Sequence, residues 1–207
     1  LQRVRTGERR RLLARPGING SPAFEPTRGD RLAVTLSTVG GNLDIYLVAL
    51  ADGALTRVTS DPAIDTEAVF SPDGRSLYFT SDRAGSPQIY RAEALANAPA
   101  KRMTFTGSYN ARPRLSPDGK QLAMVTLAGG SYRVAVQDLA TGVVRQLTKG
   151  PLDESPSFAP NGAMLIYAGR DRGQGVLATV AIDGLTTQRL KADEGEVREP
   201  VWGPRRP

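Results

Sequence analysis

The chain contains no cysteine and no histidine. Without cysteine it can form neither a disulfide framework nor a thiolate site, which fits a reducing compartment or a periplasmic protein that does without disulfides. Without histidine it lacks the Ser-His-Asp and Cys-His nucleophilic systems, imidazole acid–base catalysis and histidine-ligated zinc or iron. Catalysis within this chain would therefore have to rely on carboxylates.

Longer patterns are missing as well. The sequence has no Gly-x-Ser-x-Gly, Gly-x-Gly-x-x-Gly or Gly-x-x-x-x-Gly-Lys-Ser/Thr motif, so it offers neither a nucleophile elbow nor a phosphate-binding loop. It also has no apolar run long enough to span a membrane and no export signal. Because it begins at Leu1, part-way through a repeat, we expect a piece of a longer protein whose targeting signal lies upstream.

Positive charge is concentrated at one end of the chain. The formal net charge is +6, and residues 1–16 carry six arginines against one glutamate, which leaves the remainder nearly neutral. A nucleic-acid-binding protein would be expected to spread Lys and Arg over a face and to add stacking aromatics. The arginine-rich segment is therefore interpreted as a solvated outer strand.

One pattern recurs along the whole chain. A large apolar residue is followed by X-Pro-(Asp/Asn)-Gly, a polar pair and a run of strand-forming residues, most clearly in residues 67–82. The large apolar residues lie 43 to 46 positions apart: Phe24, Phe70, Leu115, Phe158 and Trp202. A period in the forties, with short strands between turn signals, is typical of a β-propeller of four-stranded blades. We therefore expect an all-β propeller with these side chains in its core.

The turn chemistry supports this expectation. In residues 71–74, Ser-Pro-Asp-Gly, the proline presets φ for the second position of a type I turn, and glycine follows the aspartate. The same four residues recur at 116–119, a conservative version occurs at 159–162, and an insertion marks residues 25–30. Each such turn should join the first and second strands of a blade.

The repeat predicts four complete blades and two partial ones. The complete blades cover approximately 17–60, 61–106, 107–150 and 151–195, each running from an inner to an outer strand. Residues 1–16 are expected to supply two outer strands of a further blade, and residues 196–207 an innermost strand that closes the ring. The second strand of each blade, such as residues 164–167, is apolar on both faces because blades pack on both sides.

Seven carboxylates precede the expected innermost strands and should gather at one mouth of the central channel. They are Asp65, Glu67, Asp153, Glu154, Glu194, Glu196 and Glu199. A glycosidase would need two of them about 5 to 9 Å apart, and the same oxygens could surround a cation. Because Arg112 and Arg198 occupy equivalent positions, a mixed-charge surface that binds a partner is the preferred interpretation. No cofactor and no metal are expected.

Several segments resemble the C-terminal propeller of the TolB family beyond the general turn pattern. They are residues 39–46, 79–90, 137–142, 152–157 and 159–162. The resemblance covers essentially all 207 residues. It implies a periplasmic component of the Tol-Pal system of Gram-negative bacteria, with a signal peptide, an N-terminal α/β domain and a six-bladed propeller, of which this chain would hold only part of the propeller.

The resemblance also implies partners and a binding face. Family members bind the peptidoglycan-associated lipoprotein Pal at the channel mouth and TolA through the N-terminal domain, and bacteriocin translocation segments are further candidate partners. Carried over by motif, the contact residues here are Ile18, Asn19, Gly20, Ser21, Thr66 and Glu67, and blade symmetry adds Asn110, Asp153, Glu154 and Arg198. The implied function is non-enzymatic: docking of Pal in support of outer-membrane integrity and cell division.

Two rival classes remain. The same repeats form the regulatory propeller of prolyl-oligopeptidase-like serine peptidases, which would require a downstream catalytic domain with Gly-x-Ser-x-Gly, Asp and His. A carbohydrate-lyase propeller is the second rival. It is disfavoured by the lack of histidine and by the arginines among the carboxylates of the channel mouth.

Overall fold

The computed structural model describes residues 1–37, 41–171, 173–190 and 197–203. In these ranges it contains sixteen β-strands and no helix, so none of the described residues belongs to a helix that could cross a membrane. The strands form four separate antiparallel sheets of four strands each.

Each sheet is built from four strands that pair in chain order. The first holds β1 (Asn19–Phe24), β2 (Arg31–Ser37), β3 (Leu43–Ala49) and β4 (Leu55–Arg57). The second holds β5 (Asp65–Phe70), β6 (Ser76–Ser81), β7 (Gln88–Glu93) and β8 (Lys101–Arg102). The third holds β9 (Asn110–Leu115), β10 (Gln121–Ala128), β11 (Ser131–Asp138) and β12 (Val144–Gln146). The fourth holds β13 (Asp153–Phe158), β14 (Met164–Asp171), β15 (Gln174–Ala181) and β16 (Thr187–Leu190).

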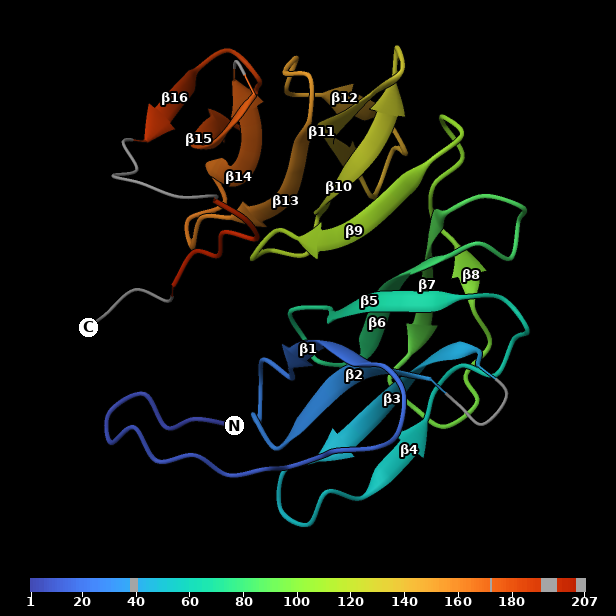
Figure 1. Ribbon diagram of the computed structural model, residues 1–207. Helices are drawn as coiled ribbons and strands as arrows, with labels where there is room; N and C mark the ends of the chain where they lie inside the picture. Colours follow the sequence, from blue (N-terminus) through green and yellow to red (C-terminus); the bar gives the residue numbers. More distant parts are fainter. Residues whose placement is uncertain (38–40, 172, 191–196, 204–207) are drawn as a thin grey trace.

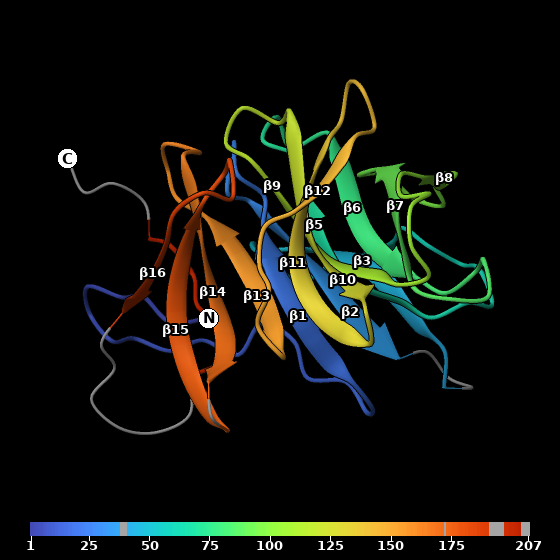
Figure 2. The same cartoon turned by 90° about the horizontal axis from the view of Figure 1, so that it is seen from above.

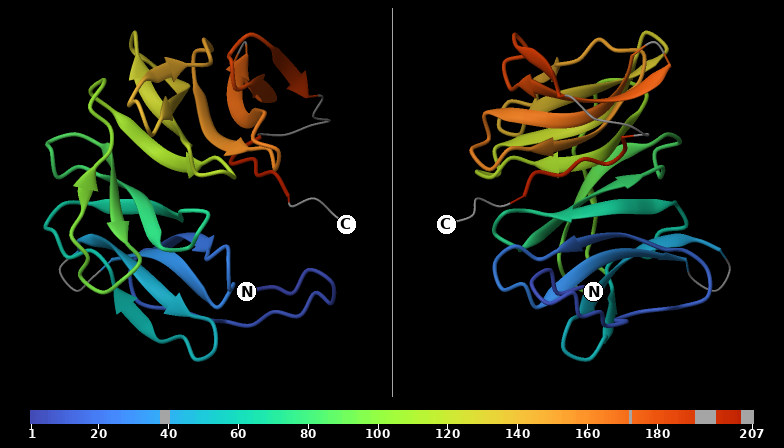
Figure 3. Two further views of the ribbon diagram at one scale, coloured as in Figure 1. Left: turned by 180° about the vertical axis from the view of Figure 1, so that it is seen from behind. Right: turned by 60° about the vertical axis from the view of Figure 1, so that its left-hand side comes forward.

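The four sheets follow one another in an arc, which confirms the expected propeller of four-stranded blades (Figure 1). The first strand of each sheet lies innermost, and successive innermost strands contact one another. Seen from above, neighbouring sheets stack face against face with their strands side by side (Figure 2). The N-terminal segment and residues 197–203 both lie on the side that the arc leaves open (Figure 3, left).

The hydrophobic core lies between successive sheets rather than inside any one of them. One cluster joins the first two blades, with Ile45 and Leu47 against Phe70 and Phe79, and a second joins the next pair through Tyr78 and residues of β10. The second strands are buried along most of their length, as their apolar sequence predicts. Burial on both faces is what holds each blade against its neighbours.

The Pro-Asp-Gly turns also connect neighbouring blades. In each regular turn the glycine N–H donates to the carbonyl three residues earlier, and its φ is 70°, a conformation that favours glycine. A Cβ added to Gly119 would lie 3.5 Å from Pro72, and one added to Gly162 would lie 3.6 Å from Pro117. The turns at residues 116–119 and 159–162 therefore each pack their glycine against the proline of the turn before, whereas Gly74 faces Glu25 and Thr27.

A second repeated contact fixes the outer strands, and the sequence prediction missed it. The hydroxyls of Thr59, Thr104 and Thr148 accept the backbone N–H of Ile45, Ile89 and Val134 at 2.9 to 3.0 Å. Two residues before each threonine, Arg57, Arg102 or Gln146 donates to that threonine's carbonyl. The recurring Arg/Gln-x-Thr at the ends of the fourth strands is the sequence signal for this contact.

Two expectations fail at the N-terminal side of the arc. Residues 1–16 form no strand: a single antiparallel bridge joins Gln2 to Arg9, and no sheet of the described structure pairs with this segment, although Leu12 and Leu13 pack against the core of the first blade. Phe24 is 62% exposed instead of buried, whereas Phe70, its equivalent in the next blade, is 7% exposed. Phe70 is covered by the first blade, and Phe24 has only the residues of the N-terminal segment beside it.

Candidate functional site

Every innermost segment contains one non-glycine residue with a left-handed backbone. These bulge residues are Ser21, Glu67, Arg112, Ser155 and Glu199, and their φ angles lie between 48° and 58°. They recur at the blade period, 43 to 46 residues apart. A left-handed conformation is unfavourable for residues with a Cβ and is often found where function requires a particular backbone geometry. The bulge residues therefore mark the candidate functional site.

The bulges arise from the local sequence. In β1, β5, β9 and β13 the register with the second strand shifts across the bulge residue and the residue after it. That following residue is proline in four of the five cases, at positions 22, 113, 156 and 200. Proline has no backbone N–H, so a proline that the bulge excludes from strand pairing leaves no hydrogen-bond donor unsatisfied.

The bulges also connect each blade to the one before it. The N–H of Glu67 donates to Thr35 Oγ1 of β2 at 3.3 Å, and the N–H of Arg112 donates to Thr80 Oγ1 of β6 at 3.1 Å. The backbone that turns away from its own sheet thus finds an acceptor on the preceding sheet. These two bonds join the second innermost segment to the first blade and the third to the second blade.

Together the bulge residues surround a cavity on the concave side of the arc, the axial cavity. Its volume is about 350 Å³, and Pro22, Ala23, Ala68, Val69, Arg114, Pro200 and Val201 complete its lining. The lining is apolar except for two serines, two glutamates and two arginines. Such a mixture of apolar walls and a few polar groups is typical of a binding site.

A network of ion pairs crosses three blades at this cavity. Arg112 Nε lies 3.2 Å from Glu67 Oε1, and Arg112 Nη1 lies 3.7 Å from Glu154 Oε2. Arg112 Nη1 also donates to Ser155 Oγ at 2.5 Å, and Thr80 Oγ1 donates to Glu67 Oε2 at 3.2 Å. The three charged side chains are 28 to 33% exposed, so they are held in place but remain accessible.

The first residue of each innermost strand has a different role. Asn19 donates its amide to the carbonyls of Arg15 and Gly17, and the buried Asn110 donates to Gln88 Oε1 and to the carbonyl of Thr106. The buried Asp153 accepts the N–H of Gly150 at 2.8 Å. These side chains hold the lead-in loops, the connections that precede innermost strands, so Asn110 and Asp153 do not reach the surface of the channel mouth.

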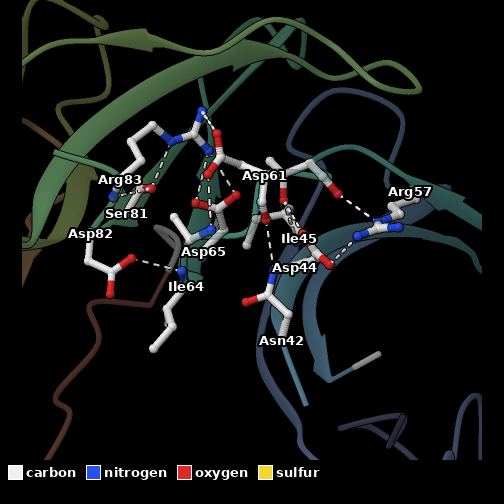
Figure 4. Close-up of polar contacts among 12 residues, drawn as sticks. Asn42, Asp44, Ile45, Arg57, Asp61, Ile64, Asp65, Ser81, Asp82 and Arg83 are labelled. Atoms are coloured by element: carbon white, nitrogen blue, oxygen red, sulfur yellow. Dashed lines mark hydrogen bonds and ion pairs between the residues drawn. The ribbon is translucent and has the colours of Figure 1, made fainter. Parts of the chain in front are cut away.

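Asp65 occupies the equivalent position in the second blade, where it faces Arg83 and Ser81 (Figure 4), and it is completely buried. Both of its carboxylate oxygens accept from Arg83 Nη2, at 3.0 and 2.9 Å, and Arg83 Nε donates to Ser81 Oγ. The guanidinium lies 4.8 Å from the ring centre of Tyr90. Burial raises the pKa of Asp65, and the bonds from Ser81 and Arg83 oppose that effect. This buried pair connects the start of β5 to the residues that follow β6 and offers no accessible carboxylate.

The remaining sequence-predicted site residues lie at the channel mouth itself. Ile18, Asn19 and Ser21 are exposed, and Gly20 and Thr66 are partly exposed. Arg198 and Glu154 line a second cavity of about 200 Å³ beside β14. Thr66 and Glu67 lie within β5 rather than before it, because the strand continues through the bulge. Glu194 and Glu196 lie outside the described residues.

The sequence reasoning missed Arg114, which lines the axial cavity. It occupies the position two residues beyond the bulge, where the other blades have Ala23, Val69, Ser157 and Val201. That departure from the small or apolar residues of the repeat is the signal that could have found it. In the described part of the chain, no three carboxylates lie close enough together to hold a metal ion.

Comparison with known proteins gives the family. The family described as the TolB beta propeller domain matches residues 1–206. The Tol-Pal system protein TolB of Bordetella pertussis is 48% identical over 161 residues, which are 77% of this chain and 36% of that protein. The TolB of Nitrosospira multiformis is 49% identical over 107 residues, 52% of this chain and 24% of that protein. The matched stretch thus spans about a third or less of these longer relatives.

Solved structures agree with this result. TolB from Acinetobacter baumannii superposes with a TM-score of 0.91 at 46% identity, covering 99% of this chain and 51% of that chain. A puromycin-hydrolysing peptidase from Mycobacterium tuberculosis superposes with a TM-score of 0.67 at 20% identity, over 87% of this chain and 29% of that chain. At that identity the second likeness shows a shared fold alone.

Proposed function

This chain belongs to the TolB β-propeller family, and from that premise we propose that it is a non-enzymatic docking propeller of a Tol-Pal system. It binds the lipoprotein Pal at the mouth of the central channel, in the periplasm, and so supports outer-membrane integrity and cell division. The single observation that carries the proposal is the ion-pair network of Glu67, Arg112 and Glu154, which is fixed across three blades and still accessible.

A rigid and accessible charged surface favours binding over catalysis. The backbone and side-chain bonds of the bulge residues already hold the surface in one conformation, so little conformational entropy is lost when a partner docks. Glu67 and Glu154 are both paired with Arg112. A glycosidase needs one carboxyl that donates a proton to the leaving group, whereas both carboxylates of this network are engaged by Arg112.

Exposed apolar side chains surround the same end of the propeller. Ile18 is 56% exposed, Ile64 49% and Phe105 73%, and each lies in a lead-in loop. The channel mouth therefore combines a charged centre with an apolar periphery. Large apolar groups that lose water on association supply much of the free energy of protein–protein binding.

The proposal is tested by titrating Pal into the protein and into its Thr66→Ile and Glu67→Arg variants. Each substitution is expected to weaken binding about thirtyfold, or about 2 kcal/mol, because contacts at the centre of an interface carry most of its energy. Melting curves of each variant separate lost binding from lost folding.

Asp52→Lys is the matched control. Asp52 lies in the hairpin between β3 and β4, at the other end of the first blade from the lead-in loops, and its carboxylate accepts the N–H of Ala54. Its variant should bind Pal within about 0.5 kcal/mol of the parent protein, as substitutions outside interfaces do. Unchanged binding by both channel-mouth variants would contradict the proposal, and loss of binding only with Asp52→Lys would assign Pal to the opposite face.

A further inference from the structure

Arg114 is a charged side chain whose hydrogen-bonding capacity is largely unused. Within the described residues, its guanidinium makes one hydrogen bond, from Nη1 to the carbonyl oxygen of Pro113 at 2.8 Å. A guanidinium has five N–H donors, so four of them have no protein acceptor there. Arg114 lines the axial cavity, and burial lowers its pKa, although an arginine stays cationic at neutral pH.

The neighbouring charges do not neutralise Arg114 directly. Glu67 is 3.2 Å from Arg112 and also accepts from Thr80, so its oxygens are already engaged. Glu199 influences Arg114 electrostatically, but no ion pair joins the two among the described residues. Ser155 accepts from Arg112, which leaves its hydroxyl hydrogen available for donation into the cavity.

We propose that the axial cavity is a carboxylate-binding site, in which the Arg114 guanidinium receives a single carboxylate and the Ser155 hydroxyl assists. The planar fork of a guanidinium matches the two oxygens of a carboxylate. The apolar walls formed by Ala68, Val69 and Val201 accommodate the carbon chain that carries it. The carboxylate can come from a free small acid or from an Asp or Glu side chain of a docked protein.

The charge of the cavity favours a carboxylate group, which carries one charge, over a phosphate group. Glu67 and Glu199 line the same cavity, and they would repel a doubly charged phosphate more strongly than a carboxylate. Glu199 also competes for Arg114, so its removal should strengthen carboxylate binding. The proposal thus makes opposite predictions for two residues of one cavity.

Trp202 provides a direct readout, because it is the only tryptophan and it adjoins Val201 of the cavity lining. Propionate and glutarate are titrated into the parent protein and followed by Trp202 fluorescence, with chloride and phosphate at equal ionic strength as comparison. Binding of the two carboxylates above both comparison anions is expected. An equal response to all four anions would overturn the proposal.

Four variants identify the residue responsible. Arg114→Gln should weaken carboxylate binding about tenfold to hundredfold, since it removes a charge-assisted bond. Arg114→Lys should restore part of the affinity, and Glu199→Gln should tighten binding. Arg145→Gln, on the exposed face of outermost strand β12, is the matched control and should change nothing. Parent-like binding by Arg114→Gln, or weaker binding by Glu199→Gln, would overturn the assignment.

Pal titrations distinguish the two sources of the carboxylate, and only this arm rests on the proposed function. If the site takes a side chain of the partner, Arg114→Gln weakens Pal binding and glutarate competes with Pal. If the acid is a free small molecule, glutarate binds at Arg114 while Pal binding is unaffected. Failure of Pal to bind at all would count against the proposed function and leave the carboxylate titration intact as a test of the cavity.

Discussion

Unfavourable backbone conformations are concentrated at one place in this molecule. Five of the non-glycine residues with positive φ are the bulge residues around the axial cavity, one in each innermost segment. Each costs about 1 to 2 kcal/mol relative to an ordinary conformation. The cost is offset by bonds to the preceding blade, such as that from the N–H of Arg112 to Thr80. At the residue scale, conformational strain and the accessible charges therefore coincide.

Ser21 allows this strain to be measured in isolation, because its exposed side chain makes no hydrogen bond in the described structure. Ser21→Gly is expected to raise the free energy of unfolding by up to about 1 kcal/mol, since glycine adopts positive φ without strain. Chemical denaturation measures the change. Ser108→Gly, at an exposed position without positive φ, should instead lower it by about 0.5 to 1 kcal/mol. A lower free energy of unfolding in Ser21→Gly would show that the backbone at Ser21 is not strained.

Glu25 predicts a pH dependence of stability. Burial would raise the pKa of Glu25, but bonds from the Thr27 hydroxyl and the N–H groups of Arg28 and Gly29 outweigh it and lower the pKa from 4.5 to about 2. The pKa is lower in the folded chain than in the unfolded one, so the carboxylate stabilises the fold above pH 4.5 and this contribution disappears as the pH falls toward 2.

The measurement is a series of melting curves between pH 2 and pH 6. The parent protein should lose more stability over this range than Glu25→Gln, whose side chain does not titrate. Parallel profiles for the two proteins would refute the role assigned to Glu25.

At the scale of the strand, the sequence predicted most of the propeller and misjudged the innermost strands. Apolar runs after the Pro-Asp-Gly turns predict second strands at residues 77–80 and 122–126, and β6 and β10 extend only one or two residues beyond these bounds. The agreement is close because burial on both faces and turn chemistry are local properties. The same pattern predicts innermost strands that begin at residues 21, 68, 112 and 157, and the observed strands begin two to four residues earlier, at Asp65 in β5 for example. The bulge residue and the proline after it interrupt the pattern of alternating side chains. Whether the chain before the bulge also pairs with the second strand depends on that neighbouring strand, so the local sequence does not reveal it.

The same comparison explains what could be known of the site. The charges of Glu67 and Glu154 were visible in the sequence, but the burial of Asn110 and Asp153 depends on loops that fold back onto them. Similarly, the exposure of Phe24 depends on what lies across from its blade. The burial or exposure of these residues depends on contacts between elements, which the repeat pattern of the sequence does not reveal.

Blade stacking makes a quantitative prediction for two equivalent phenylalanines. Phe70→Ala should lower the free energy of unfolding by about 3 to 5 kcal/mol, because it leaves a cavity between the first and second blades. Phe24→Ala should cost less than about 1 kcal/mol, because that ring is already mostly in water. Chemical denaturation of both variants checks the pair. Equal losses of unfolding free energy in the two variants would contradict the exposure of Phe24, because they would mean that both rings are equally covered.

At the scale of the whole molecule, the two ends of the blades present different side chains. At one end, the Pro-Asp-Gly turns pack glycine against proline from blade to blade and leave little that is chemically distinctive. At the other end, the lead-in loops, the ion-pair network and the exposed apolar side chains surround the axial cavity. The two ends thus differ in their side chains, and the proposed docking of Pal assigns recognition to the second end alone.

Amide hydrogen exchange with and without saturating Pal tests this separation most directly, because it reports on both ends of each blade in one experiment. The account predicts added protection in residues 60–70 and 104–115, which contain the lead-in loops and strands β5 and β9. It predicts no change in the turns at residues 71–75 and 116–120, at the opposite ends of those strands. Protection confined to the turns, or absent from both lead-in loops, would contradict the claim that the channel mouth is the docking face.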